Sequence, residues 1–301
     1  MARKHIVLYG LSANPPTGNG GHRGIVQYLV KNSDEENTKF NEIWILPVYK
    51  HAFDSKSNLL DYDHRMEICR LNFEDLSKGN GTNSTNCKVY VSDYERTIKT
   101  QLSEITKNSV KRLENSTNLG TINISGNRNL SKEFIGTVDV LVQLKRDYPD
   151  TDFSFVMGHD TYFDLLNGLW KGGQRIFDEV RHLYVIKREG TVRANKKSNG
   201  SNFKKINIEG FNLSKVVDIE IEGLTDISSS KIRKQFSDLK KLLLAKLSRK
   251  SIEREFGTGS QNNSKFNIKV TDIFTKINEG LYDEVLIYIM NHLDVYEYYT
   301  N

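Results

Sequence analysis

The chain contains 301 residues, of which 37% are hydrophobic, and its formal net charge is +5. This composition allows a buried core and excludes wholesale disorder, while the length suits one large domain or two small ones. Two cysteines are too few for a disulfide framework, and the sequence has neither an apolar run of membrane-spanning length nor a secretory signal pattern. We therefore expect a soluble protein of the cytoplasm or nucleus that binds no membrane.

Segments with strand and helix patterns alternate along the chain. In order, the predicted elements are a strand at 5–9, a helix at 22–31, a strand at 43–48, a helix at 63–76, a strand at 88–92, a helix at 134–147, a strand at 153–157, a helical region at 160–180, strands at 182–186 and 216–221, and a helix from residue 228. This alternation predicts an α/β fold: a Rossmann-like, doubly wound parallel sheet with helices on both faces, in a single domain spanning residues 1–301. Such sheets bind ligands beyond the carboxyl ends of their strands.

Three polar segments interrupt this order, at residues 79–86, 108–128 and 248–267. They are rich in Asn, Ser, Thr or Gly and contain few residues that a core would bury. We interpret them as flexible surface insertions without a chemical role.

Positive charge is concentrated in residues 231–254, which contain nine Lys or Arg and two Asp or Glu. This segment also has apolar residues at helical spacing, namely Ile232, Phe236, Leu239, Leu243 and Leu247. We interpret it as a solvated helix with one buried stripe, in preference to a surface for nucleic acid or membrane. Nucleic acid is therefore not an expected partner.

The first functional signal is the loop between the first strand and the first helix. Residues 12–21 are rich in Gly, Asn and Pro, and His22 follows where helical spacing begins. A strand, a glycine-rich loop and a helix start leave backbone N–H groups unpaired, and the helix dipole favours an anion there. Because His22 adds a donor that can carry positive charge, these features predict a phosphate site.

A second signal lies far downstream, where residues 226–233 read Asp-Ile-Ser-Ser-Ser-Lys-Ile-Arg. The serines are typical of a helix N-terminus, where their hydroxyls cap free N–H groups. We expect Lys231 and Arg233 to project from the first helical turn toward the same anion, with the Arg233 side chain solvated when no nucleotide is bound.

Together the two segments resemble the signatures of nucleotidyltransferases related to class I aminoacyl-tRNA synthetases, and most closely those of nicotinate/nicotinamide mononucleotide adenylyltransferases. In that family a Pro-Pro stretch leads to Thr or His and then to Gly-His, as Pro15-Pro16 leads to Gly21-His22 here. Residues 227–233 match the family's Ile-Ser-Ser-Thr/Ser-x-Ile/Val-Arg motif residue for residue. Thr17 and His22 lie farther apart than is usual, so either Asn19 takes the first position or the loop carries extra residues.

The resemblance implies adenylyl transfer from ATP to nicotinate or nicotinamide mononucleotide in NAD biosynthesis, with release of pyrophosphate. It implies Mg²⁺ as a cofactor, bound mainly through the ATP phosphates, and no protein ligand to a metal. His22 and Arg233 are the implied catalytic residues. The implied ATP contacts are Gly10, Ser12, Asn14, Thr17, Asn19, Gly21, Gly158, Asp160, Ser228, Ser229, Ser230 and Lys231. The implied contacts to the pyridine mononucleotide are Lys50, Lys56, Arg65, Tyr94 and Trp170, where Lys50 and Lys56 are alternatives for one lysine.

Several of these residues also have an ordinary structural interpretation. Gly158 would let a nucleotide approach the backbone, and Asp160 suits either ribose hydroxyls or a helix N-cap. Tyr94 either stacks on the pyridine ring or packs at a strand end, and Trp170 either stacks on the base or belongs to the core.

Other function classes fit the sequence less well. Glycines 18, 20 and 24 superficially suggest a dinucleotide-binding dehydrogenase, but the second strand is followed by the basic Lys50 where that class has an acidic residue. No P-loop lysine pattern is present, and the seven histidines show no metal-ligand spacing. Transfer to another phosphate such as phosphopantetheine and a catalytically inactive regulatory relative stay open, as do the acid-or-amide preference and a homo-oligomeric state.

Overall fold

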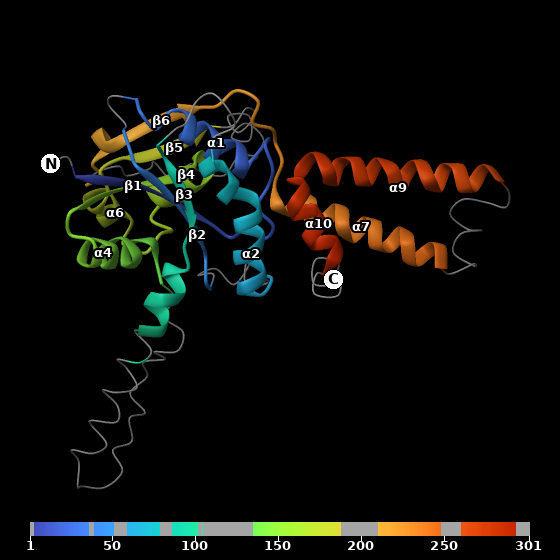
Figure 1. Cartoon of the computed structure of the whole chain (residues 1–301), viewed down its shortest axis with the longest axis horizontal. Helices are drawn as coiled ribbons and strands as arrows, with labels where there is room; N and C mark the ends of the chain where they lie inside the picture. The colour runs from blue at the N-terminus through green and yellow to red at the C-terminus, as the bar shows by residue number, and fades with distance from the viewer. Residues whose placement is uncertain are drawn as a thin grey trace, which may run out of the picture.

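The computed structural model describes residues 3–35, 39–50, 59–78, 86–101, 104, 135–187, 210–247 and 260–292. Its centre is a parallel sheet of six strands in the order β3-β2-β1-β4-β5-β6 (Figure 1). The strands are β1 (Lys4–Leu11), β2 (Glu42–Pro47), β3 (Lys88–Val91), β4 (Thr151–Gly158), β5 (Leu183–Lys187) and β6 (Val216–Glu220). The predicted α/β, doubly wound sheet is thus confirmed.

Helices cover both faces of the sheet. One face packs against α1 (His22–Lys31), α2 (Tyr62–Phe73) and the 3-10 turn η2 (Glu74–Lys78). The other packs against α4 (Thr137–Asp147), α5 (His159–Leu166) and α6 (Gly173–Glu179), and a short 3-10 turn, η5 (Leu213–Lys215), precedes β6. The predicted helical region at 160–180 is therefore two helices. Gly168 and Gly172 separate them in the left-handed conformation, which glycine adopts without steric cost.

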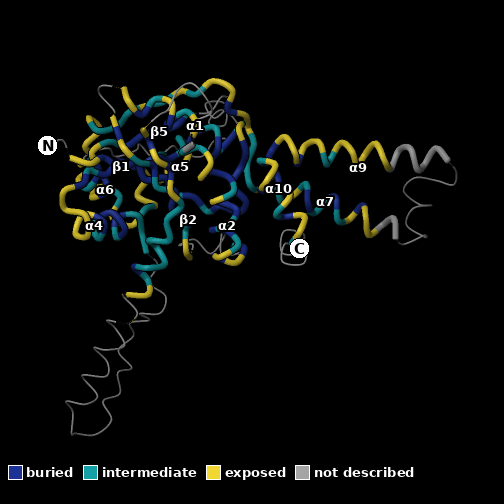
Figure 2. Tube along the Cα trace, viewed as in Figure 1, coloured by how far each residue is buried: buried dark blue, intermediate teal, exposed yellow. Residues whose placement is uncertain are grey.

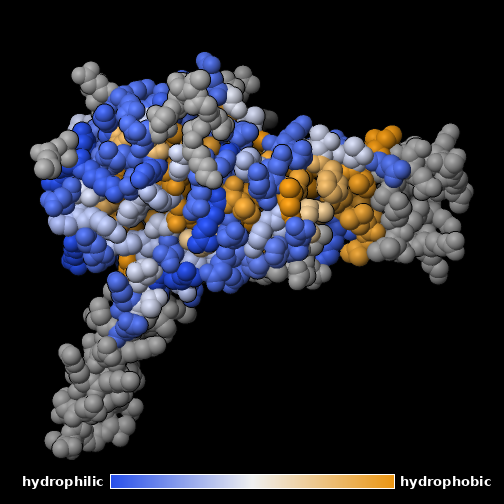
Figure 3. All heavy atoms as spheres, viewed as in Figure 1, coloured by the Kyte–Doolittle hydropathy of each residue, from blue (hydrophilic) through white to orange (hydrophobic). Residues whose placement is uncertain are grey.

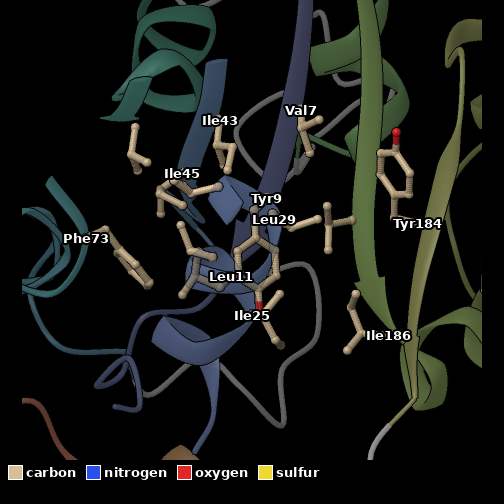
Figure 4. Packing of buried hydrophobic residues seen from close by; sticks show 14 of the residues in the cluster. Val7, Tyr9, Leu11, Ile25, Leu29, Ile43, Ile45, Phe73, Tyr184 and Ile186 are labelled. Carbon is tan, nitrogen blue, oxygen red and sulfur yellow. The ribbon is translucent and has the colours of Figure 1, made fainter. Parts of the chain in front are cut away.

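Because both faces are covered, the central strands are apolar along almost their whole length. In β1, Val7 and Tyr9 face the core beneath α1, while Ile6 and Leu8 face the core on the opposite side. Figure 4 shows the first of these cores, where Ile25 and residues of β2 and β5 surround Tyr9. The alternation of side chains along each strand thus supplies two cores from one sheet.

A third group of helices follows the last strand. α7 (Ser229–Leu247) and α9 (Ser260–Gly280) run side by side away from the sheet, and α10 (Asp283–Asn291) turns back toward α2 (Figure 1). Their shared core includes Ile232, Phe236, Ile277 and Val285. In this group all three helices carry exposed residues, and these are most frequent along the described part of α9 (Figure 2).

Two expectations about this C-terminal part were wrong. Residues 260–267, expected to belong to a flexible insertion, form the first turns of α9. The stripe of α7 is buried at Ile232, Phe236 and Leu239 but continues through Leu242, while Leu243 is 46% exposed. Leu242 and Leu243 follow Leu239 by three and four residues and lie on either side of the same helical face, of which only the Leu242 side is buried. The other predicted insertions, at 79–85, 108–128 and 248–259, lie outside the described residues.

Surface character differs between the two halves of the molecule. Hydrophilic residues cover most of the sheet-containing body, whereas apolar residues gather on the outer part of α7 and α9, including Leu243, Leu244 and Ile268 (Figure 3). Among the helices that the structure describes, none has the length and apolar character needed to cross a membrane.

The strand order places the predicted site. β1 and β4 are neighbours at the centre of the sheet, where the direction of strand succession reverses. The connections after these two strands therefore leave the sheet in opposite directions, and sheets of this topology bind their ligands at the carboxyl edge beside such a reversal. Helix α5 begins directly after β4, and α1 begins after the loop that follows β1, so the N-terminal dipoles of both helices are directed toward that edge.

Candidate active site

The loop after β1 brings Thr17 and His22 into direct contact. The Thr17 backbone N–H donates to His22 Nδ1 at 3.0 Å, and the Thr17 hydroxyl lies 2.7 Å from the same nitrogen. The His22 backbone N–H in turn donates to Thr17 Oγ1 at 2.8 Å. Because Nδ1 accepts a backbone proton, the neutral ring carries its own proton on Nε2. The longer spacing between Thr17 and His22 is thus compatible with one compact unit.

This compact loop requires glycine. A Cβ at Gly21 would lie 2.1 Å from Thr17 Oγ1, and one at Gly24 would lie 1.9 Å from the carbonyl oxygen of Asn19. Both distances are too short for any side chain. The glycines therefore allow the loop to fold over itself and to present its backbone at the carboxyl edge of the sheet.

The serine-led helix α7, which follows much later in the chain, contacts the same loop. Ser229 Oγ donates to the Pro15 carbonyl at 2.7 Å, and the Arg233 guanidinium donates to the Asn14 carbonyl at 2.5 Å, across 219 positions. The Ser228 hydroxyl accepts from the Lys231 backbone N–H at 3.3 Å, as an N-cap does. The two segments singled out in the sequence are therefore neighbours in space.

Two basic side chains of this helix do not lie as expected. Arg233 is partly buried, and it donates to the Asn14 carbonyl and to Ser230 Oγ (3.2 Å) instead of standing in solvent. Lys231 points back to Asp226, with Nζ 2.5 Å from the carboxylate. A cation at a helix start finds local carbonyl and carboxylate acceptors, which the sequence pattern alone does not reveal.

At the neighbouring strand, β4 ends at Gly158 and α5 begins with His159 and Asp160. Asp160 is exposed, and its Oδ1 lies only 2.6 Å from the place where a Cβ at Gly158 would stand. The absence of a side chain at Gly158 thus lets the Asp160 carboxylate fold back over the end of β4. Gly10, at the end of β1, lies above the Phe155 ring, with 3.2 Å between that ring and a Cβ built at Gly10.

Arg65, an implied substrate contact, is 1% exposed and lies beneath the loops. Its guanidinium donates to the carbonyl oxygens of Leu60 (2.8 Å), Ser12 (3.1 Å), Val48 (2.6 Å) and Tyr49 (3.3 Å). These acceptors belong to the loops after β1 and β2 and to the start of α2. Arg65 therefore holds the segments after β1 and β2 against the segment that leads into α2, and its guanidinium is engaged by backbone carbonyls.

The remaining implied contacts differ in their surroundings. Lys50 is exposed after β2, whereas Lys56 lies outside the described residues. Tyr94 packs against the core, and its hydroxyl donates to Asp147 of α4. Trp170 is partly buried, with its ring 6.3 Å from Phe155 in an edge-on arrangement.

Glu95 is a titratable residue at this edge that the sequence analysis did not single out. Its carboxylate accepts the Tyr49 backbone N–H at 2.8 Å, so it joins the segments after β2 and β3. Burial raises the pKa of Glu95 to about 7, although the Tyr49 hydrogen bond and the Arg65 charge oppose this shift. The acidic pair Asp93 and Glu95, directly after a strand end, was the available signal.

Comparisons with known proteins agree with this arrangement. The model of the cytidylyltransferase-like family matches residues 15–235. A comparison with curated proteins finds no match. The fold is similar to that of "Plasmodium falciparum nicotinic acid mononucleotide adenylyltransferase complexed with APC", with a TM-score of 0.53 and 17% identity over 98% of each chain. A structure of the same enzyme "complexed with NaAD" matches with a TM-score of 0.53 and 18% identity, again over 98% of each chain.

The structural similarity establishes a shared fold, and the family model extends from the loop after β1 into helix α7. It thus includes both segments that meet at the carboxyl edge of the sheet. On this evidence, the chain belongs to the cytidylyltransferase-like family.

Proposed function

We propose that this protein transfers the adenylyl group of ATP to the 5′-phosphate of a pyridine mononucleotide. The product would be deamido-NAD from nicotinate mononucleotide, or NAD from nicotinamide mononucleotide, and pyrophosphate would leave. The observation that carries the proposal is the contact between the His22 loop and the serine-led helix, in which Ser229 and Arg233 bond the backbone of residues 14 and 15.

The chemistry needs little acid–base catalysis. An oxygen of the mononucleotide phosphate, already ionised at neutral pH, attacks the α-phosphorus of ATP as the bond from that phosphorus to the β-phosphate oxygen breaks. Electrons and charge pass to pyrophosphate without a net proton transfer. Catalysis is then the alignment of two polyanions and the stabilisation of charge in the transition state.

The site residues suit these roles. Because Nδ1 accepts the Thr17 backbone N–H, the His22 ring would donate from Nε2 to the α-phosphate. Arg233 would exchange its bond to the Asn14 carbonyl for the β- and γ-phosphates, which its planar fork matches. Ser229 and Ser230 would hold the same phosphates at the helix N-terminus. Asp160 would accept from the ribose hydroxyls.

Mg²⁺ belongs to this proposal as a companion of ATP. It supplies positive charge to the phosphates, and phosphate oxygens and water are ligands that this ion favours. Within the described residues, no group of three or more His, Cys, Asp or Glu side chains could hold a metal ion.

The similarity to the two Plasmodium falciparum structures supports the choice of a pyridine mononucleotide. The test offers the purified protein ATP and Mg²⁺ with nicotinate mononucleotide, nicotinamide mononucleotide or phosphopantetheine in parallel, and follows both pyrophosphate and the adenylylated product. We expect turnover with at least one pyridine mononucleotide. Turnover with phosphopantetheine alone, or with none of the three, would refute the proposal.

A further inference from the structure

We propose that the turn between α9 and α10, residues 280–282, is a positioning element of the phosphate loop, and that Tyr282 and Asp75 are positioning residues for His22. The inference rests on the proposed function only for its kinetic test. The turn lies more than 250 positions after the loop that it contacts, and neither motif includes it.

The first contact is made through the backbone of the loop. The Gly18 N–H donates to the Gly280 carbonyl at 3.0 Å. A Cβ at Gly18 would stand 2.9 Å from the carbonyl carbon of Leu281, so the two backbones touch with no room for a side chain. The loop is thus held against the C-terminal turn at Gly18.

The second contact is made through Arg23, on the first turn of α1. Its guanidinium forms a two-bond ion pair with Asp75 of η2 (2.8 and 2.5 Å) and also donates to the Asn72 carbonyl. Tyr282 covers this pair, since its ring centroid lies 3.7 Å from Arg23 Cζ and its hydroxyl donates to Asp75 at 3.2 Å. The Arg23 side chain is only 5% exposed, so the pair is shielded from solvent on the arginine side.

Asp75 is held in its charged form by these contacts. Partial burial opposes ionisation, but the hydrogen bonds and charge of Arg23, together with the Tyr282 hydroxyl, lower the pKa of this carboxyl below its ordinary value. At neutral pH the pair therefore attaches the start of α1 to η2, and Tyr282 attaches both to the C-terminal turn.

His22 lies between these two attachment points in the chain. Before His22 in the chain, the Gly18 N–H is hydrogen-bonded to the Gly280 carbonyl of the turn. After His22, the Arg23 guanidinium stacks on the Tyr282 ring of the turn and pairs with Asp75. The same turn also meets the serine-led helix, because a Cβ at Gly280 would stand 3.1 Å from the Ile232 side chain. Residues 280–282 therefore lie where the two phosphate-binding segments meet, and they fix one segment against the other.

The variant Tyr282→Leu tests this role, because it removes the ring and the hydroxyl while leaving the Arg23–Asp75 ion pair in place. Tyr90→Leu is the matched control, since Tyr90 is 42% exposed on the edge strand β3. The first measurement is amide hydrogen exchange of residues 17–24, which requires no turnover. We expect faster exchange in Tyr282→Leu and wild-type exchange in Tyr90→Leu. Unchanged exchange in Tyr282→Leu would overturn the inference.

The second measurement is steady-state kinetics with ATP and the pyridine mononucleotide that turns over. Since a displacement of about 1 Å at a reacting group can cost up to about 100-fold in rate, we expect Tyr282→Leu to lower kcat by about 10- to 100-fold while the KM for ATP changes little. In a His22→Ala background the same substitution should cost almost nothing more, because both changes act through one side chain. An equal loss in both backgrounds would show a role independent of His22 and overturn the inference.

Failure of the proposed function and failure of the positioning role give different results. If the wild-type protein transfers no adenylyl group, the proposed function fails, and hydrogen exchange still decides whether the turn orders the loop. If Tyr282→Leu does not fold, Tyr282→Phe is used instead, because it keeps the ring over Arg23 and removes only the bond to Asp75. A smaller increase in exchange over residues 17–24 is then expected, and wild-type exchange in this variant would overturn the inference.

Discussion

At the scale of single residues, the contact between Thr17 and His22 determines how the histidine can act. Two donors of Thr17 lie at Nδ1, and the His22 backbone N–H returns a bond to the threonine hydroxyl. The imidazole is therefore oriented and its tautomer fixed before any nucleotide binds. A donor that is held in place in this way costs little reorganisation when negative charge develops on a phosphate.

Replacement of His22 by alanine is expected to lower kcat by about 10²–10³-fold, the typical loss for one donor to a developing oxyanion. The KM for ATP should change much less, because the hydrogen bond strengthens mainly in the transition state. Steady-state kinetics measures both values, with Tyr90→Leu on the edge strand β3 as the control. A kcat close to that of wild type would remove His22 from the mechanism.

Arg233→Lys is expected to weaken the use of ATP, because a single ammonium group cannot reproduce the planar fork that suits adjacent phosphates. Since Arg233 also donates to the Asn14 carbonyl in this structure, the substitution should cost about 0.5–1.5 kcal/mol of unfolding free energy as well. Urea unfolding and ATP kinetics on the same samples measure the two effects. Full ATP use by the lysine variant would contradict the proposed role.

The motifs allowed some of these residues to be predicted and not others. Pattern and resemblance identified the two segments that meet, because motif residues are local in sequence and parallel strands end at one edge. The directions of individual side chains were not predictable: Arg65 is directed to backbone carbonyls and Lys231 to Asp226. Such directions depend on acceptors supplied by the tertiary structure, and a motif contains no information about them.

At the scale of elements, α9 shows why composition alone misled the prediction for residues 260–267. Their Ser- and Asn-rich sequence is typical of a flexible segment, yet they begin a helix that continues through Val270, Ile273, Phe274 and Ile277. These apolar residues pack against α7 and α10, so the helix is stabilised by tertiary contacts rather than by intrinsic propensity. Strands and the earlier helices were predictable because their own periodicity was clear.

Ile277→Ala tests the contribution of this packing. Ile277 is fully buried, and removal of a buried isoleucine side chain to alanine typically costs about 2–5 kcal/mol. Ile268→Ala, on the same helix but 68% exposed, should change the unfolding free energy by less than about 0.5 kcal/mol. Urea unfolding of the two variants compares them directly. Equal effects would show that α9 does not depend on the core that it shares with α7.

At the scale of the whole molecule, each edge of the sheet carries a group whose pKa is shifted, and the two shifts have opposite signs. His5, near the start of β1, places Nδ1 2.7 Å from the Lys39 carbonyl and Nε2 2.8 Å from Ser154 Oγ, so the neutral ring donates to the first and accepts from the second. Burial lowers its pKa to about 4, although the Lys39 hydrogen bond opposes the shift. At the other edge, burial raises the pKa of Glu95 to about 7.

In an unfolded chain the ordinary pKa is about 4.5 for glutamate and about 6.5 for histidine. Between these two pH values the shifts of Glu95 and His5 change the free energy of unfolding in opposite directions. As the pH falls through this window, the unfolded chain gains a proton on His5 that the folded chain lacks, so His5 lowers the free energy of unfolding. Glu95 gains its proton at a higher pH in the folded chain than in the unfolded chain. Glu95 therefore raises the free energy of unfolding as the pH falls. In the wild-type protein the two effects partly cancel.

Single substitutions should separate them. Relative to wild type, His5→Asn is expected to gain roughly 2 kcal/mol of unfolding free energy on going from pH 7 to pH 5, since the shift of one histidine no longer opposes folding in acid. Glu95→Gln should show the opposite sign, because it removes the group that favours the folded state as the pH falls. Urea unfolding at the two pH values measures both differences, and carboxylates elsewhere cancel in the comparison with wild type. If both variants follow the pH dependence of the wild-type protein, neither group is held away from its ordinary pKa in the fold.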